Sequence, residues 1–470
     1  MDRTKSQRKG MLTYRPVAET VEPRVLLSHA VVSLRQNEPT ALLHLAPAYQ
    51  AVRPNTPVAP FGSPLATATF LDTSSHILNG NHVIVGQKSL VGPFATLDGR
   101  SGFIKLGSGS QVLDNATIVA TLNPQRNQPT TNVLIGDAVS IGFGATVYGP
   151  SSIGAYGTSA KPTGIGPNAL IDGAVISPGA VVGALARVGP GVTVPAGMYV
   201  LPGKNITTQA EASNPALGKV QALPAAILAD LTTSLARGSA LASGYTSLYQ
   251  GSAATGVNTG VDPSVAGVFN GNLAAVRGTS QEPGPATSTA ATGITFEPSR
   301  TGPKFPGPFK PSVESNLPNF PARITGDVRF TSRVRVVAHH ISRSNAFRAD
   351  QGQPITFASA PTTGSAVTIN SPLGGTVTTG STTKTVGGIT IGKNLIANAG
   401  AVLLGGPDTS YTLGDNVTLG TSSVVNRSSI GAGATIGARA YVSGSTVAPG
   451  AVIAPSTILI NNQIVGTVAW

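Results

Sequence analysis

The chain has 470 residues and no cysteine, which excludes a disulfide framework, a thiolate metal site and a thiol nucleophile. Charged residues make up 11% and aromatic residues 5%, whereas 57 glycines and 36 prolines are typical of a β-rich chain with many tight turns. The net charge of +12 allows an anionic partner, but the scattered basic residues argue against nucleic acid. The sequence predicts no membrane span.

The N-terminal segment, residues 1–55, is basic at its start and differs in character from the rest of the chain. Its apolar part is interrupted by Ser28 and His29, which makes it a poor secretory core. The stretch VEPRVLLS (21–28) resembles the LEPR-XLL motif of planctomycete proteins, with Val21 in place of leucine. This resemblance implies export or a cell-surface location, and a basic tail on a cytoplasmic protein is the alternative.

A six-residue repeat begins near residue 80 and continues to about residue 205. In each unit an aliphatic residue is followed by glycine or another small residue, which is the signature of a parallel β-helix. Each coil buries its apolar face only against its neighbours, so several coils must stack. The spacing is clearest at Ile135, Ile141, Val147 and Ile153, and it continues at Val182, Val188, Val194 and Val200.

The repeat stops after about residue 205 and returns at 411–460, so the chain holds two β-helices. Between them, residues 224–238 place Ile227, Leu228, Leu231 and Leu235 on one helical face, with Pro224 opening the helix and Gly238 closing it. The predicted domains are a tail (1–55), a first β-helix (56–212), a helical segment (213–280), a proline-rich linker (281–321) and a second β-helix (322–470).

Residues 324–357 resemble the N-terminal coils of γ-class carbonic anhydrases, whose Arg-x-Asp-x-Gly-x-Pro-Ile signature is carried here by Arg348, Asp350, Gly352, Pro354 and Ile355. The stretches 95–107 and 194–212 are similar to other parts of that family. The resemblance implies an all-β fold of left-handed parallel β-helices, usually trimeric, with a helix packed alongside. A closed three-fold arrangement needs three β-helices, and one chain has two.

Members of this family hold a metal, usually zinc, on three histidines that activate a water molecule for attack on CO2. The matching positions are Val119, Phe143 and Tyr148 in the first copy and Leu404, Thr421 and Asn426 in the second, and none can supply an imidazole or a carboxylate. We therefore expect no catalytic residue and no metal at these positions, with Phe143 and Tyr148 filling the vacated cavity. The neighbouring family carboxylate is replaced by Ser101 and Gln351. The histidines lie elsewhere, at positions 29, 44, 76, 82, 339 and 340.

The charges of the signature are exchanged between the two copies. Arg348 and Asp350 of the second copy match Asp98 and Arg100 of the first. The resemblance places these residues near a subunit interface. One hypothesis pairs Asp98 with Arg348 and Arg100 with Asp350 across the two copies, and the alternative is two exposed turns whose charges have drifted.

Together these features predict a non-catalytic structural or interaction module that self-associates through its β-helices. Anionic polymers or cell-surface material are its possible partners. One alternative is an active carbonic anhydrase with zinc, iron or cobalt at a relocated site. Another is a hexapeptide acyltransferase, for which His82 is the only candidate base in the first β-helix. The sequence does not determine whether the two β-helices pair within one chain.

Overall fold

The computed structural model describes residues 69–249 and 323–470, together with 288–289 and 295–296. The gaps inside these ranges are 73, 80–81, 122–130, 327, 331–340, 343, 350–353, 372–374, 380–381 and 407–408. The basic tail, most of the proline-rich linker, Asp350, Gln351 and four of the histidines (29, 44, 339 and 340) therefore lie outside the described residues. Both β-helices belong to one compact unit, Ala48–Trp470.

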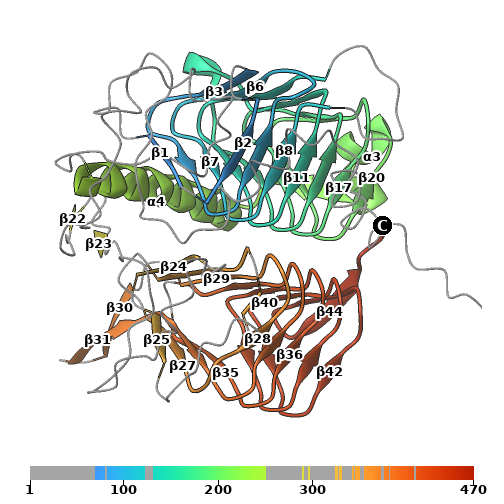
Figure 1. Cartoon of the computed structure of the whole chain (residues 1–470). Coiled ribbons are helices and arrows are strands. Elements are labelled where there is room, and N and C mark those ends of the chain that lie inside the picture. The colour runs from blue at the N-terminus through green and yellow to red at the C-terminus, as the bar shows by residue number, and fades with distance from the viewer. Residues whose placement is uncertain are drawn as a thin grey trace, which may run out of the picture. The chain divides into compact units, whose positions relative to one another are not determined.

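The first β-helix consists of three parallel sheets whose strands alternate along the chain (Figure 1). Sheet A contains β1 (Phe70–Leu71), β4 (Leu90–Val91), β7 (Gln111–Val112), β10 (Val139–Ile141), β13 (Thr163–Ile165), β16 (Val181–Val182) and β19 (Met198–Val200), and ends with antiparallel β21 (Val220–Ala222). Sheet B contains β2 (His76–Leu78), β5 (Thr96–Asp98), β8 (Thr117–Val119), β11 (Thr146–Tyr148), β14 (Leu170–Asp172), β17 (Arg187–Val188) and β20 (Asn205–Ile206). Sheet C contains β3 (Val83–Val85), β6 (Ile104–Leu106), β9 (Val133–Ile135), β12 (Ser151–Ile153), β15 (Val175–Ile176) and β18 (Thr193–Val194).

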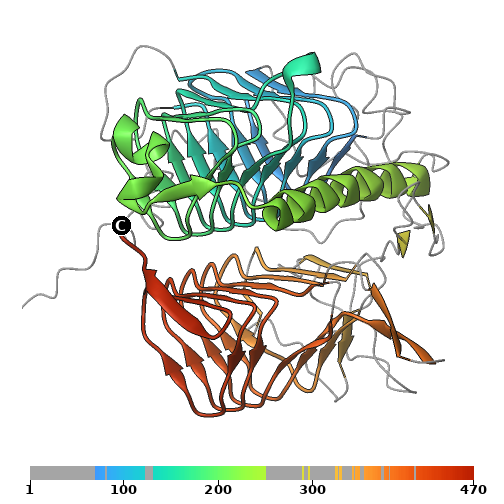
Figure 2. The same ribbon diagram turned by 180° about the vertical axis from the view of Figure 1, so that it is seen from behind.

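The second β-helix, orange to red in Figure 2, repeats this plan of three parallel sheets. In the order of the strands along the chain, sheets E, G and F take the places of sheets C, A and B. Sheet E contains β25 (Val328–Phe330), β27 (Ile355–Phe357), β32 (Ile389–Ile391), β35 (Tyr411–Leu413), β38 (Ser429–Ile430) and β41 (Thr446–Val447). Sheet G contains β28 (Thr362–Thr363), β33 (Ile396–Ala397), β36 (Thr418–Leu419), β39 (Thr435–Ile436) and β42 (Val452–Ile453). Sheet F contains β24 (Arg323–Gly326), β26 (Ala346–Ala349), β29 (Thr368–Asn370), β34 (Val402–Leu404), β37 (Val424–Asn426), β40 (Tyr441–Ser443) and β43 (Thr457–Ile460), and ends with antiparallel β44 (Gln463–Thr467).

The six-residue repeat supplies the core of each β-helix. Ile135, Ile141, Val147 and Ile153 have no exposed surface, and their equivalents on successive coils form one continuous apolar cluster. Burial of each such side chain contributes about 1.5–3 kcal/mol. At Gly166 a side chain would meet the backbone nitrogen of Ala184 at 2.6 Å, so glycine lets adjacent coils stack closely. The fold class predicted from the sequence, two parallel β-helices, is confirmed by the order of the strands in the sheets.

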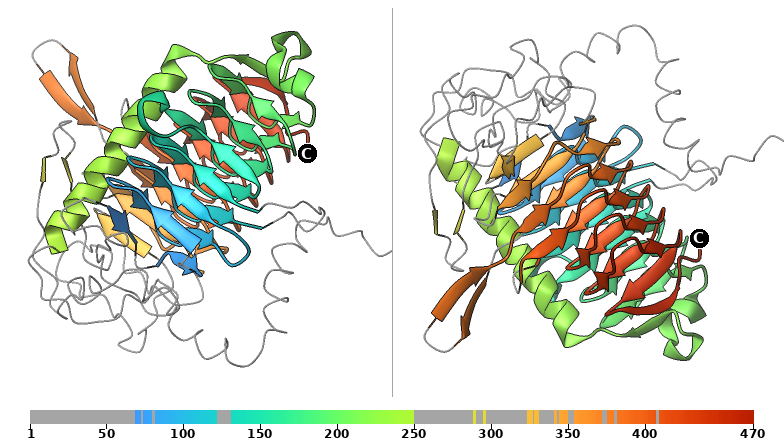
Figure 3. Two further views of the ribbon diagram at one scale, coloured as in Figure 1. Left: turned by 90° about the horizontal axis from the view of Figure 1, so that it is seen from above. Right: turned by 90° about the horizontal axis from the view of Figure 1, so that it is seen from below.

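Helix α4 (Ala225–Tyr249) packs along sheet A, against β1, β4 and β10 (Figure 3). Leu235 and Leu241 are buried on this face, whereas Leu228 is exposed. The prediction that Gly238 ends the helix is wrong. Gly238 stays helical where α4 approaches the side chain of Gln111 so closely that a Cβ atom would collide with it. Among the described residues, no helix has both the length and the apolar character required to cross a membrane.

Smaller elements complete the described part of the chain. After β20, helix α3 (Gln209–Ser213) and the 3-10 turn η6 (Pro215–Leu217) lead into β21, and a further 3-10 turn, η5 (Gly157–Ser159), leaves the first β-helix between β12 and β13. Two antiparallel hairpins are formed by β22 (Ser288–Thr289) with β23 (Thr295–Phe296) and by β30 (Gly375–Thr379) with β31 (Thr382–Val386).

Candidate functional site

The two β-helices contact each other within the chain along a surface that we call the seam. On the first β-helix the seam consists of turns that connect sheet A to sheet B, and on the second it consists mainly of sheet F and its flanking turns. Its apolar part is a cluster of Phe143 and Leu185 from the first β-helix with Val402 and Val424 from the second. The sequence did not determine whether the two β-helices pair within one chain, and these contacts show that they do.

Asparagine side chains add specific hydrogen bonds to the seam. Asn115 and Asn168 occupy turn positions with φ of 59° and 52°, a left-handed conformation that asparagine adopts more readily than most residues. Asn115 Nδ2 donates to Thr368 Oγ1 at 3.1 Å, and Asn168 Nδ2 donates to the carbonyl oxygens of Gly400 and Ser422, each at 3.1 Å. The turn conformation required by the β-helix therefore also directs polar side chains at the second copy.

The C-terminal residues connect the ends of the two β-helices. The Trp470 indole Nε1 donates to the Leu185 carbonyl oxygen, and the Ala469 backbone nitrogen donates to the Gly203 carbonyl oxygen at 2.8 Å. The chain has one tryptophan, so its fluorescence reports on the seam.

A buried ion pair crosses the seam. Arg348 Nη1 lies 2.7 Å from Asp114 Oδ1, and their side chains are 4% and 0% exposed. The hypothesis paired Arg348 with Asp98, but within the chain its partner is Asp114, in a turn that follows sheet A. Asp98 instead pairs with Arg100, at 2.8 Å, within its own copy. The other predicted pair, Arg100 with Asp350, involves a residue outside the described part of the chain.

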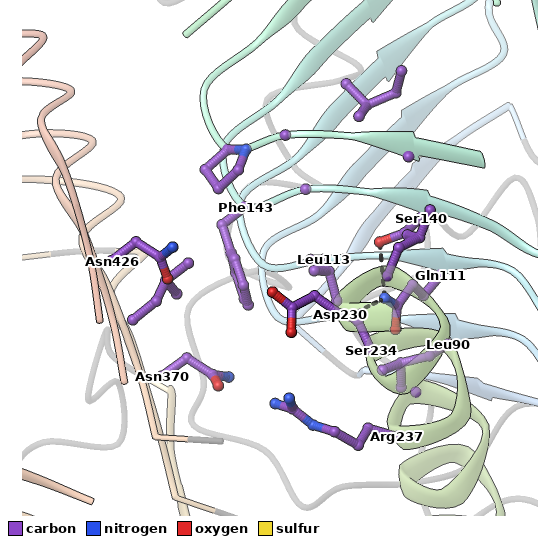
Figure 4. A pocket seen from close by; sticks show the side chains of 18 of the residues that line it. Leu90, Gln111, Leu113, Ser140, Phe143, Asp230, Ser234, Arg237, Asn370 and Asn426 are labelled. Carbon is purple, nitrogen blue, oxygen red and sulfur yellow. Dashed lines mark hydrogen bonds between the residues drawn. The ribbon is translucent and has the colours of Figure 1, made fainter. Parts of the chain in front are cut away.

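Three of the six positions aligned with the metal ligands converge at the seam. Phe143 from the first β-helix and Leu404 and Asn426 from the second line one cavity (Figure 4). Leu404 and Asn426 are neighbours in register on β34 and β37. The other three positions are apart from this cavity: Val119 and Tyr148 are register neighbours on sheet B, and Thr421 lies in an exposed turn after β36.

The residues at the converging positions do not fit zinc. Phe143 and Leu404 have no donor atom, and Phe143 is packed in the seam with 9% of its surface exposed. The Asn426 amide donates to Ser443 Oγ at 3.2 Å and also bonds the Tyr441 phenol. Burial raises the pKa of that phenol, so Tyr441 stays neutral and serves as a structural hydrogen-bonding group. We therefore derive no metal-dependent step from this site.

Histidine and carboxylate side chains form no other candidate metal site within the described residues. His82 Nδ1 lies 2.8 Å from the Gly99 carbonyl oxygen, and its ring contacts Phe103 with centroids 4.5 Å apart. No three histidine, cysteine, aspartate or glutamate side chains gather as potential metal ligands in this part of the chain. His82 is therefore engaged in local structure on the first β-helix.

The cavity at the seam has a volume of about 260 Å³ and is bounded by sheet A, sheet F and α4. One side is polar, because Gln111 Nε2 donates to Ser140 Oγ and Ser234 Oγ, both at 2.8 Å. Asp230 and Arg237 from α4 also line it, and Asp230 pairs with Arg427 of the second β-helix at 2.9 Å. Sequence reasoning missed these α4 residues, because helix periodicity revealed only the apolar face of the helix. It also missed Asp114, which lies in a turn between β7 and β8.

No model of a protein family and no curated protein matches the chain, whereas parts of the chain align with solved structures. One solved structure is an acetyltransferase candidate from Bacillus cereus, with 21% identity over 39% of this chain and 91% of that chain, and a TM-score of 0.22. Another is a hexapeptide transferase family protein from Anaplasma phagocytophilum, with 18% identity over 38% and 92% and a TM-score of 0.20. At these TM-scores the alignments carry no conclusion about either fold or activity.

Proposed function

We propose that this protein is a non-catalytic binding and structural module, a tandem relative of the γ-class carbonic anhydrases in which the two β-helices are joined at a former metal site. The observation that carries the proposal is Phe143, which sits at a position aligned with a metal ligand and packs instead against Leu185, Val402 and Val424. An aromatic side chain in that place stabilises the contact between the copies and removes a ligand.

The buried pair of Asp114 and Arg348 supports the same proposal. In the family resemblance, Arg348 belongs to a signature near a subunit interface, and here its charge is used to join two copies of one chain. A function that depends on a fixed arrangement of the two β-helices, such as presenting a surface to a partner, agrees with this use of the signature. Activity needs a site and not only a fold.

Metal content and CO2 hydration of the full chain test the proposal. The protein is folded in the presence of zinc, iron and cobalt, and bound metal is then measured by elemental mass spectrometry. We expect metal near zero and hydration at the buffer rate. Metal near one equivalent per β-helix together with hydration above buffer would overturn the proposal, and release of coenzyme A from acetyl-coenzyme A would favour an acyltransferase.

A further inference from the structure

The charged side chains that line the cavity at the seam compensate one another. Arg348 pairs with Asp114 at 2.7 Å, and Arg427 pairs with Asp230 at 2.9 Å. Arg237, the third arginine of the lining, is also engaged by a partner. A charged ligand would therefore be buried without a counter-charge, which is costly. The balance of charges in the lining favours a neutral ligand over an anion or a cation.

A polar side chain without a hydrogen-bond partner lies in the same cavity. Asn370 is 8% exposed, and among the described residues nothing bonds its side-chain amide. Figure 4 shows this amide directed toward the side of the cavity on which Asp230 lies. Buried polar groups are nearly always hydrogen-bonded, so the amide needs a ligand or an ordered water in the cavity. One amide supplies two N–H donors and a carbonyl acceptor to such a ligand.

Hydroxyl and carboxylate groups extend the polar lining. Ser140 Oγ and Ser234 Oγ each accept a hydrogen bond from Gln111 Nε2 at 2.8 Å, and within the described chain neither hydroxyl donates to another atom. The Asp230 carboxylate accepts from Arg427 at 2.9 and 3.0 Å, and each oxygen keeps a further lone pair. The lining thus offers both donors and acceptors, and hydroxyl groups, which donate and accept, match both.

The size and the apolar surface of the cavity limit the ligand further. A volume of about 260 Å³ is just below the range of drug-sized ligand sites. Phe143 and Leu404 contribute apolar surface to the lining. A single sugar ring or a short polyol carries C–H groups next to its hydroxyl groups and so satisfies both kinds of surface. A large cofactor does not fit.

We propose that this cavity binds a small neutral polyhydroxyl compound, a monosaccharide or a polyol, whose hydroxyl groups bond the Asn370 amide. The Ser140 and Ser234 hydroxyls and the Asp230 carboxylate supply the other polar contacts. The proposal goes beyond the structural role proposed above. It does not depend on whether the chain binds metal, because none of these four residues occupies a position aligned with a metal ligand.

Saturation-transfer NMR titrations of the full chain test the site, with D-glucose, D-mannitol and glycerol as neutral probes. We expect saturable binding to one site per chain for at least one probe, and preference for D-glucose or for the open-chain probes separates a sugar from a polyol. Succinate, a small dianion, serves as the charged probe. It should show no saturable binding, because the arginines of the lining are already engaged.

Asn370→Leu keeps the branched shape of the side chain and removes its donors and its acceptor. It should weaken binding of the preferred probe about tenfold. The urea midpoint of the unliganded variant should equal or exceed that of the unmodified chain, since the buried amide has no hydrogen bond to lose among the described residues. A lower midpoint together with unchanged affinity would show that the amide is structural, and would overturn the site.

The matched control is Asn205→Leu. Asn205 lies on β20 of sheet B and is absent from the cavity lining, and its side-chain oxygen is also buried without a hydrogen bond among the described residues. The affinity of this variant should stay within about twofold of the unmodified chain. Trp470 emission checks that the seam is intact in both variants.

Three results would overturn the site: no saturable binding of any neutral probe, as for a cavity that holds only water; succinate binding as tight as that of the best neutral probe; and equal losses in Asn370→Leu and Asn205→Leu. Any of them in a chain without bound metal would reject this site and leave the proposed structural role standing. Bound metal with CO2 hydration, together with a selective loss in Asn370→Leu, would reject the structural role and support this site.

Discussion

Sheet B of the first β-helix and sheet F of the second occupy the same place in the repeat, but only sheet F faces the seam. In sheet B, the outward positions run in register through Asp98, Val119, Tyr148 and Asp172. In sheet F, they run through Arg348, Asn370, Leu404 and Asn426. The comparison shows that strand position sets which way a side chain points, whereas the partner packed against it sets its role.

The charges on the two sheets show the difference most directly. On sheet B, Asp98 pairs with Arg100, whose side chain is 48% exposed. On sheet F, Arg348 is almost fully buried against Asp114 of the other copy. An exposed pair contributes little because water and salt screen it, whereas a broken buried pair leaves an uncompensated charge.

The largest expected effect comes from rebuilding a metal site at the seam. The triple variant Phe143→His, Leu404→His and Asn426→His should bind zinc, because these three positions line one cavity. We expect about one equivalent with a dissociation constant of about 1 µM or tighter, equivalent to about 8 kcal/mol. Elemental mass spectrometry and a zinc-competition titration measure it.

The control for this variant is the triple Val119→His, Tyr148→His and Thr421→His, which uses the same aligned positions away from the seam cavity. Within one chain it should bind zinc at least about a hundredfold more weakly, since two imidazoles form a poorer site than three. Equal affinity of the two triples would mean that convergence at the seam is not what assembles the ligands.

A smaller effect is expected from breaking the buried ion pair. Arg348→Ala should lower the free energy of unfolding by about 3–5 kcal/mol, because it leaves the Asp114 carboxylate buried without its partner. Urea unfolding followed by Trp470 fluorescence measures the change at the seam. Arg100→Ala, which breaks the exposed pair on sheet B, should cost less than about 1 kcal/mol. Similar losses in both variants would contradict the difference between the two sheets.

The apolar part of the seam gives the third test. Phe143→Ala should destabilise the chain by about 3 kcal/mol, since the ring is buried between the two β-helices and its removal leaves a cavity. Phe103→Ala is the control, because Phe103 is 49% exposed on the first β-helix, and it should cost less than about 1 kcal/mol. The same urea titration compares them. A loss of stability in Phe143→Ala no larger than that in Phe103→Ala would show that the Phe143 ring does not stabilise the seam.

The smallest effect is expected at the end of the first β-helix. Glu211 forms a capping box with Thr208 in α3, and the hydrogen bond from Lys219, followed by the Thr207 backbone hydrogen bond, lowers its pKa to about 2. The stabilisation is thus present above the unfolded pKa of about 4.3 and is lost as the pH falls toward 2. Glu211→Gln should cost less than about 1 kcal/mol at pH 7.

Unfolding experiments at pH 7 and pH 3 check the sign of this pH dependence. The difference between the unmodified chain and Glu211→Gln should shrink at pH 3, because part of the carboxylate contribution is already lost there. A difference that grows at pH 3 would show that the capping contacts do not hold the carboxylate in its charged form.

The local parts of the fold were predictable from the sequence. Ile135, Ile141 and Val147 were placed in the core by spacing alone, and they are fully buried. The start of α4 after Pro224 was also predicted, but its extension past Gly238 was not. Glycine often follows the end of a helix because its backbone adopts the left-handed conformation easily. In α4, Gly238 instead allows the helix to approach the side chain of Gln111.

The candidate site was only partly predictable. The aligned positions identified Phe143, Leu404 and Asn426 separately, and the structure brings them to one cavity. The partner of Arg348 could not be predicted, because Asp114 is 234 residues away and lies in a turn without any motif. Arg237 was also missed, because a polar helix residue carries no sign of the surface it will face.

The sequence by itself determined that the chain forms two β-helices, because each coil depends on residues only a few positions apart and on contacts with the next coil. It also determined that the aligned positions carry no imidazole, since this follows from residue identity alone. Only the tertiary structure decided which face of each β-helix meets the other. That choice depends on contacts such as Asp114 with Arg348 and Asn168 with Gly400, which join turns and strands far apart in the sequence.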